Sequence, residues 1–218
     1  MRRVSSAVGV AAALITTSFL GAPMAAAAPC QTTTLSVWLS IANFSCTVGD
    51  KSFSNFSYSP DGFTLVPATS VGVGPDNLFG LPGLAFNAFW QNPAGSGANF
   101  DALLSFDVTS LGAPINDFHF ALDGVVGPVL DVATLTFPNG TAVSLSSSNN
   151  NSQTLTFAPV MSLHVQDDIG VSPGGTISSV HKSFSQVPGP IVGAGLPGLV
   201  AACGGLLALA RRRRRQCA

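Results

Sequence analysis

Glutamate is absent from this sequence, and charged residues of any kind make up only 9% of its 218 residues. Hydrophobic residues make up 46%, a share too high for a disordered chain. The low charge is equally unlike that of an ordinary cytosolic enzyme. Glycosidases need two carboxylates and commonly use glutamate for one of them, so the composition gives no sign of that chemistry.

Basic residues are nearly absent between the two ends of the chain. Lys51 and Lys182 are the only ones between Arg3 and Arg211, whereas all ten acidic residues are aspartates. Two lysines against ten aspartates leave a formal charge of −8 in this middle part. A surface so poor in cations does not attract a phosphate backbone, which argues against nucleic-acid binding.

The N-terminal residues 1–28 have the three-part pattern of a secretory signal peptide. Arg2 and Arg3 provide the positive start, residues 7–20 form an uncharged, mostly apolar run, and small residues follow at 25–28. The apolar run would rise only about 21 Å as a helix, which is too short for the ~30 Å hydrocarbon core. We therefore expect cleavage at an Ala-x-Ala site and export of the remainder.

The C-terminal part carries a second apolar run. Residues 191–210 contain no charge, and as a helix they would span about 30 Å, the thickness of one bilayer core. Five arginines follow directly, and anionic lipid holds guanidinium groups on the cytoplasmic side of a membrane. This pattern predicts one transmembrane helix and a membrane stop formed by Arg211, Arg212, Arg213, Arg214 and Arg215.

The string Val187-Pro188-Gly189-Pro190, the apolar run and the arginine tail together resemble a PEP-CTERM sorting signal, at residues 187–218. In that family of exported bacterial proteins a Pro-Glu-Pro motif precedes a membrane helix and a basic tail; this chain has Gly189 where glutamate is usual. The resemblance implies a membrane-embedded sorting peptidase, exosortase, as a partner. It also implies a cell-surface or extracellular destination in bacteria that make exopolysaccharide or biofilm. The alternative is a permanent single-pass anchor.

Apolar and polar residues alternate in several windows of residues 29–186. A period of two is typical of a strand with one face in the core and one in water. No comparable run has helical spacing, so we expect no helix here. The windows predict four groups of inward residues: Leu84, Phe86 and Trp90; Leu104, Phe106 and Val108; Phe118, Phe120 and Leu122; and Met161, Leu163 and Val165.

Turn-forming residues separate these windows at short intervals, among them Pro60-Asp61-Gly62, Pro138-Asn139-Gly140 and Pro173-Gly174-Gly175. Many short strands between regular turns indicate a β-sandwich or barrel. We predict one all-β ectodomain at residues 29–186, an antiparallel, jelly-roll-like β-sandwich of about eight to eleven strands. The segments 46–58 and 162–188 also resemble PEP-CTERM ectodomains, which have no generally assigned activity.

Four cysteines are too few for a disulfide scaffold. Cys203 falls in the apolar run and Cys217 in the basic tail, so neither belongs to the exported domain. Cys30 and Cys46 remain as an even pair in an oxidising compartment, and we predict a disulfide between them.

None of the three histidines, His119, His164 and His181, has a partner at zinc-site spacing. Asp117 shares the outward strand face of His119, and a Ser–His–Asp hydrolase could be built from such parts. Serine is so frequent in this chain that its proximity means little. We therefore interpret the histidines as solvated surface residues and expect no catalytic residues.

Asp167 and Asp168 precede Gly170 and could supply oxygen ligands to Ca²⁺, as could Asp61 or Asp76 in loops. No EF-hand or nonapeptide pattern surrounds them, so we expect acidic, solubilising loops and no cofactor.

These observations predict an exported, non-enzymatic cell-surface or extracellular-matrix protein with a structural or adhesive role beside exopolysaccharide. The alternative is a secreted carbohydrate-binding or hydrolytic module with a plain C-terminal membrane anchor. The expected partners are the membrane, an exosortase-like sorting peptidase and exopolysaccharide, and not nucleic acid.

Overall fold

Residues of alternating polarity form strands along most of the part of the chain that the structure describes. The computed structural model describes residues 27–62, 65–76 and 78–186. These residues include the short helix α1 (Leu35–Ser40) and the 3-10 helix η1 (Ala68–Ser70). Their strands are β1 (Thr33–Thr34), β2 (Ser45–Val48), β3 (Lys51–Gly62), β4 (Gly72–Pro75), β5 (Gly83–Gln91), β6 (Phe100–Ser110), β7 (Ile115–Asp123), β8 (Val129–Thr136), β9 (Ala142–Ser147), β10 (Gln153–Val160), β11 (Ser162–Val171) and β12 (Thr176–Gln186).

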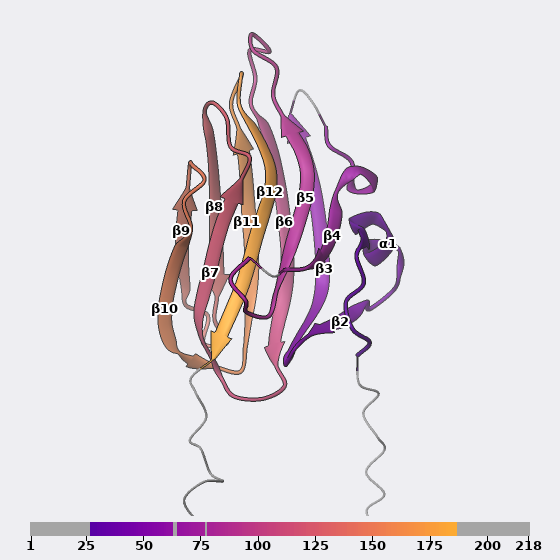
Figure 1. Ribbon diagram of the computed structural model, residues 1–218, viewed down its shortest axis with the longest axis vertical. Helices are drawn as coiled ribbons and strands as arrows, with labels where there is room; N and C mark the ends of the chain where they lie inside the picture. The colour runs from indigo at the N-terminus through magenta and orange to yellow at the C-terminus, as the bar shows by residue number, and fades with distance from the viewer. Residues whose placement is uncertain (1–26, 63–64, 77, 187–218) are drawn as a thin grey trace, which may run out of the picture.

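The strands form two six-stranded sheets that pack face to face (Figure 1). The sheet that we name the β12 sheet has the order β1-β4-β5-β12-β7-β10, and the β11 sheet has the order β2-β3-β6-β11-β8-β9. Neighbouring strands within each sheet run antiparallel. The antiparallel β-sandwich predicted for the middle of the chain is therefore confirmed, with one strand more than the expected range.

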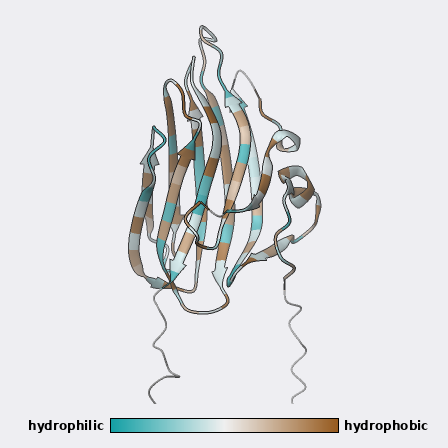
Figure 2. Cartoon of the chain, in the orientation of Figure 1, coloured by the Kyte–Doolittle hydropathy of each residue, from teal (hydrophilic) through white to brown (hydrophobic). Residues whose placement is uncertain are grey.

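Hydrophobic and hydrophilic residues alternate along the strands in Figure 2. The predicted inward residues of β5, β6 and β7 are all buried, as are Leu163 and Val165 of β11. Met161 is the exception, because it lies just before β11 begins and is 49% exposed. A period-two pattern thus predicted the buried faces correctly wherever a strand actually forms.

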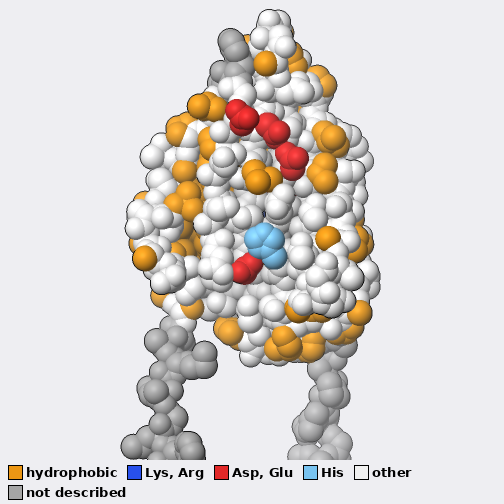
Figure 3. Space-filling view, turned by 180° about the vertical axis from the view of Figure 1, so that it is seen from behind, with side chains coloured by type: hydrophobic (Ala, Val, Ile, Leu, Met, Phe, Trp, Pro, Cys, Tyr) orange, Lys and Arg blue, Asp and Glu red, His pale blue; other side chains and the backbone are white. Residues whose placement is uncertain are grey.

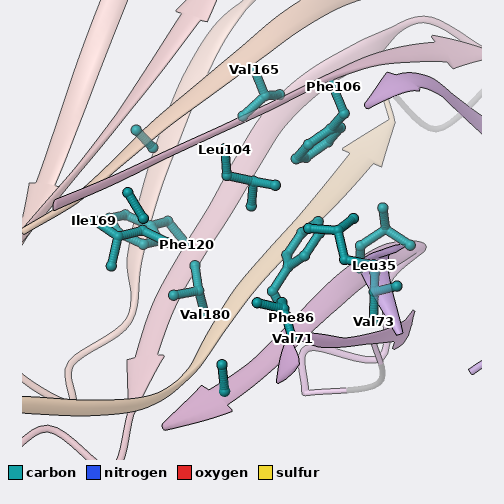
Figure 4. Close-up of a cluster of buried hydrophobic side chains, with 14 of the residues drawn as sticks. Leu35, Val71, Val73, Phe86, Leu104, Phe106, Phe120, Val165, Ile169 and Val180 are labelled. Carbon is teal, nitrogen blue, oxygen red and sulfur yellow. The ribbon is translucent and has the colours of Figure 1, made fainter. Parts of the chain in front are cut away.

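Phenylalanine side chains fill much of the space between the sheets. Phe106 lies at the centre of this group, with its ring centroid 6.1 Å from Phe53, 5.8 Å from Phe56 and 5.8 Å from Phe86. Figure 4 shows Phe106 and Phe86 together with aliphatic residues from both sheets. Aromatic pairs at these distances add to the stability that burial provides.

Two local predictions were wrong. Pro60-Asp61-Gly62 is no turn but the end of β3, where Asp61 pairs with Asp101 of β6. The helix α1 was not expected; it buries Leu35 and Trp38, and two apolar residues in six are too few for a periodic signal. By contrast, Pro138-Asn139-Gly140 does join β8 to β9, and Gly140 takes the positive φ of 81° that this turn requires.

The predicted disulfide between Cys30 and Cys46 is present, with the two Cα atoms 4.7 Å apart. Backbone hydrogen bonds reinforce it, because Cys30 N donates to Thr47 O and Thr47 N donates to Ala28 O, both at 2.9 Å. The first described residues and the end of β12 lie at the same end of the sandwich (Figure 1). The described part of the chain thus begins and ends at one pole.

The predicted terminal segments fall largely outside the described residues. These include the signal peptide up to residue 26, the sorting motif Val187, Pro188, Gly189 and Pro190, the apolar run 191–210 and the arginines of the membrane stop. No helix within residues 27–62, 65–76 and 78–186 is both long enough and apolar enough to span a bilayer.

Candidate functional site

The outward face of the β11 sheet is covered mainly by short polar side chains. Strand register places Ser54, Asp107, His164 and Thr136 in one row across β3, β6, β11 and β8. The next row across the same four strands is Ser57, Ser105, Gln166 and Thr134. Figure 3 shows the side of the molecule opposite to Figure 1, with a histidine beside an acidic side chain and a row of acidic side chains nearer one end. The strand pattern thus builds an open, hydrogen-bonding surface.

A chain of hydrogen bonds joins three side chains on this face. Asn55 Nδ2 donates to Asp107 Oδ2 at 2.6 Å, and His164 Nδ1 lies 2.6 Å from Asp107 Oδ1. Because a carboxylate accepts hydrogen bonds, Nδ1 is the donor in this pairing, and Nε2 remains free for another partner. The sequence predicted the outward positions of Asp107 and His164 but not their pairing across two strands.

A β-bulge places Asn55 in this chain. The register between β3 and β6 shifts between Ser54 and Ser57, and Asn55 has a φ of 54°. Asparagine tolerates this left-handed conformation better than most residues, which makes it suited to a bulge. The same bulge brings Phe56 into contact with Phe106 and Trp38. The bulge therefore places Asn55 on the surface and Phe56 against the core.

These groups line an open groove of about 420 Å³. Its other lining residues are mainly hydroxyl-bearing, including Thr109, Thr136 and Ser162. Asp107 carries the one carboxylate in the whole lining. Phe137 and Pro138 form part of the groove and also part of a neighbouring, more apolar pocket of about 340 Å³. In that pocket the rings of Phe137 and Phe157 lie 5.0 Å apart. A polar groove is thus continuous with an apolar shelf.

A pair of carboxyl groups lies farther along the same face. Asp101 and Asp168 line a third pocket, of about 250 Å³. Partial burial, a hydrogen bond with Asp168 and the negative charges of Asp168 and Asp61 raise the pKa of Asp101 from 3.8 to about 6. The described residues contain no group of three or more acidic, histidine or cysteine side chains arranged to hold a metal ion.

Replacing Asp101 with asparagine is expected to remove a pH dependence of stability. Between pH 3.8 and about 6, folded Asp101 binds its proton more tightly than the unfolded chain does. The stabilisation of the folded state that comes from this tighter proton binding is therefore full below pH 3.8 and is lost as the pH rises through about 6. Urea unfolding at several pH values should show wild-type stability falling over this range more than that of Asp101→Asn. Asp123→Asn, an exposed carboxyl on β7, is the control, and equal slopes for wild type and Asp101→Asn would contradict the prediction.

The acidic, solubilising loops expected from the aspartates are not what Asp76, Asp167 and Asp168 form. Asp167 and Asp168 lie in β11 and face opposite ways, since Asp167 is fully buried and Asp168 is exposed. Asp76 is buried as well, and its oxygens accept hydrogen bonds from Ser183 Oγ, from Leu78 N and from the ring of His181. Burial alone would raise the pKa of Asp76, but these hydrogen bonds outweigh it and lower the pKa. Asp76 therefore fastens its segment to β12.

The interpretation of the histidines as solvated surface residues fits His164, whose side chain is 40% exposed, but not His181, whose side chain is only 14% exposed. Besides the pairing of His164, the ring of His181 lies 3.0 Å from Asp76 Oδ1, and Nδ1 of His119 lies 3.0 Å from Thr154 Oγ1. Burial lowers the pKa of His119 despite the nearby charge of Asp117. Asp117 itself accepts a hydrogen bond from Ser185 Oγ at 2.6 Å, and no hydrogen bond between Asp117 and His119 is present among the described side chains.

The sequence from Gly170 to Gly174, with Ser172 at its centre, matches the Gly-x-Ser-x-Gly pattern of serine hydrolases. That pattern carries its chemistry at a strand-to-helix turn. Here it spans the end of β11 and the turn into β12, another strand. No histidine lines the pocket to which Ser172 contributes. The match therefore lies in the turn by which the chain passes from the β11 sheet to the β12 sheet.

No protein-family model matches this chain, and no curated protein matches its sequence. The structure of TmCBM61 in complex with β-1,4-galactotriose covers 61% of this chain and 88% of its own, with 14% identity and a TM-score of 0.42. A structure on the promiscuous specificity of carbohydrate-binding modules of the β-sandwich superfamily covers 74% of this chain and 64% of its own, with 9% identity and a TM-score of 0.29. The enzymatically active domain of tailspike protein 4 of bacteriophage CBA120 covers 60% of this chain and 19% of its own, with 17% identity and a TM-score of 0.29. Matches of this identity and TM-score place the chain in no family and assign it no ligand.

Proposed function

We propose that this protein binds neutral polysaccharide through the outward face of its β11 sheet. The observation that carries the proposal is the groove in which Asn55, Asp107 and His164 are joined by hydrogen bonds beside the apolar shelf of Phe137 and Phe157. Few convergent polar groups next to apolar surface are typical of small-molecule and glycan sites. The function is therefore binding, in an adhesive or matrix setting.

The groove suits the two-sided chemistry of a sugar. Sugar hydroxyls both donate and accept hydrogen bonds, and the groove offers a carboxylate, an amide, an imidazole and several hydroxyls. The C–H face of a sugar ring is apolar and can pack on an aromatic surface such as that of Phe137. In addition, β5 to β12 follow the strand order of a jelly roll, an architecture that lectin domains use; this is an analogy of fold.

The charge of the described surface favours a neutral ligand. Both lysines in the described residues, Lys51 and Lys182, are 0% exposed, so no lysine or arginine of the described residues reaches the surface. Exposed carboxylates such as Asp61, Asp101 and Asp168 lie on the same face as the groove. An anionic polysaccharide would be repelled by this surface, whereas a neutral one would not.

The groove supports binding better than hydrolysis. A glycosidase needs two carboxylates with separate roles, and the groove offers only Asp107. A serine hydrolase needs a hydroxyl hydrogen-bonded to the second nitrogen of its histidine. Among residues 27–62, 65–76 and 78–186 no hydroxyl makes that contact with Nε2 of His164.

Export and surface attachment belong to the same proposal. Their support is the sequence alone: the signal-like residues 1–28 and the PEP-CTERM-like residues 187–218. A domain that begins and ends at one pole, as here, can be held there while its broad faces stay open to a polymer. Intact masses of the protein from membrane and medium fractions would test sorting, since a product that ends near Pro188 is expected.

Affinity electrophoresis tests the binding proposal. The full chain, in mild detergent, should be retarded in gels that contain at least one neutral glucan, galactan or mannan, and not in gels that contain alginate. His164→Ala should weaken this retardation about tenfold in Kd, because the hydrogen bonds of a desolvated polar group are worth ~1–3 kcal/mol. Asn55→Gly should act similarly, since glycine keeps the backbone conformation of the bulge.

The matched control is His119→Ala, which removes a histidine from the other sheet. It should leave the retardation unchanged. Retardation of His164→Ala and His119→Ala to the same extent as wild type would show that binding does not use the groove. Release of reducing ends from a retained polysaccharide, abolished by His164→Ala, would favour the hydrolytic alternative instead.

A further inference from the structure

Three ionisable side chains meet in the core, between the sheets and away from the proposed binding face. Lys182 enters from β12, whereas Asp131 of β8 and Asp167 of β11 enter from the other sheet, and all three are 0% exposed. Lys182 Nζ lies 2.6 Å from Asp167 Oδ1 and 3.9 Å from Asp131 Oδ2. It also lies 3.5 Å from the ring centroid of Phe120, which helps to keep water out.

One buried cation cannot neutralise two buried carboxylates. Burial and the charge of Asp167 raise the pKa of Asp131 well above its ordinary value, although the charge of Lys182 acts in the opposite direction. The raised pKa favours the protonated form of Asp131, which lies beside the ion pair of Lys182 and Asp167. Both oxygens of Asp131 and Oδ2 of Asp167 have no hydrogen-bond partner among the described residues. Polar atoms buried in this way are costly and rare in folded proteins.

The same arrangement is suited to a condensation. When a proton passes from the ammonium of Lys182 to the carboxylate of Asp167, an amine and a carboxylic acid stand in contact. Neither is charged, so an apolar core favours this form far more than water does. Groups held at van der Waals distance react as if their concentration were ~10⁵ M or more. Asp131 lies near Asp167 on the inward face of the same sheet. It pairs with Ile169, which is two residues from Asp167 along β11.

We propose that Lys182 and Asp167 condense into an amide bond that links the two sheets, with Asp131 as the group that transfers protons. Nζ of Lys182 attacks Cγ of Asp167, and the new N–C bond forms as one C–O bond breaks. Asp131 gives its proton to the departing oxygen and takes one from the nitrogen, so it returns to its starting state. The ammonium and carboxylate together lose one water molecule, and no oxidant or cofactor takes part.

The product removes the charges that made this cluster costly. The amide carbonyl can accept a hydrogen bond from the hydroxyl of protonated Asp131. The amide N–H can donate one to the carbonyl oxygen of the Asp131 carboxyl group. Lys51 provides an internal comparison, since it is equally buried but pairs with the partly exposed Asp50 beside it in the chain, at 2.8 Å. Lys51 therefore lacks the second buried carboxyl group that the reaction at Lys182 uses.

Trypsin digestion of the full chain, after reduction and denaturation, tests the cross-link directly. Lys51 and Lys182 are the only tryptic sites between Arg3 and Arg211. An amide on Lys182 blocks cleavage there, so the fragment that starts at residue 52 should run past 182 and be lighter than its sequence by one water. Release of an unmodified fragment 52–182 from the wild-type protein would overturn the proposal.

Two substitutions separate the role of Asp131 from nearby charge. Asp131→Asn keeps the shape but cannot shuttle a proton, and we expect it to slow the cross-link ~10²–10⁴-fold and restore cleavage after Lys182. Asp168→Asn removes the neighbouring carboxyl on the outward face and should leave Lys182 resistant. Cleavage counts as support only if Asp131→Asn keeps its native near-ultraviolet circular dichroism; for a variant that does not fold, the wild-type masses alone decide. Persistent resistance in folded Asp131→Asn would contradict its role in proton transfer.

Discussion

Replacing Phe106 with alanine is expected to lower the free energy of unfolding by about 3–5 kcal/mol. Phe106 is 0% exposed and lies on β6, in the middle of the β11 sheet. Its ring touches Phe53 and Phe56 of β3 in its own sheet and Phe86 of β5 in the opposite sheet. Alanine would leave a cavity that rings from two sheets cannot close without breaking their other contacts, so the cost should lie in the upper part of the usual range.

Chemical unfolding in urea measures this loss, and Phe89→Ala is the matched control. Phe89 is 63% exposed on β5, so its removal should change the free energy of unfolding by less than about 0.5 kcal/mol. A loss below about 1 kcal/mol for Phe106→Ala would mean that the core repacks far more easily than its aromatic contacts suggest.

Removing the disulfide by Cys30→Ser together with Cys46→Ser is expected to cost about 3 kcal/mol. The bridge closes a loop with a sequence separation of 16, and in the chain-entropy view a loop of this size restricts the unfolded chain by about that amount. Both cysteines are buried against the core, at 5% and 2% exposure, so the folded state also loses packing. The N-terminal segment that pairs with Thr47 is expected to loosen first.

A reductant provides the comparison for the disulfide. Wild-type protein in dithiothreitol should unfold at the same urea concentration as the double variant, and the variant should not respond to the reductant. Equal stability of the oxidised wild type and the double variant would contradict a stabilising role of this bridge.

The buried faces of the strands could be predicted because a period of two is a local property. Phe106 and Asp107 are adjacent, and their positions in the strand alone determine that Phe106 faces the core and Asp107 faces outward. The pairing of Asp107 with His164 could not be predicted in this way. The two residues are 57 positions apart in the sequence, and their contact depends on the register between β6 and β11. The same holds for Asn55, whose place on the face depends on a bulge.

The acidic residues show a second limit of sequence patterns. Asp167 and Asp168 suggest a shared loop site when they are considered as neighbours in the chain. In the strand β11 they face opposite ways, and Asp167 meets Lys182 of the other sheet. Charged residues such as Lys182 and Asp131 are normally exposed, so their chemistry argued against the inward positions that strand alternation gives them. Only the packing of two sheets brings them together.

The position of β12 has a mechanical consequence. This strand ends at Gln186, at the pole where the described chain also begins, and it lies between β5 and β7 in its sheet. A pull on the chain beyond Gln186, with the β11 sheet held by a polymer, would act along the length of β12. The hydrogen bonds to both neighbours would then be sheared together, not opened one by one as at a sheet edge. A domain with this topology should withstand drag in flowing water better than one that ends in an edge strand.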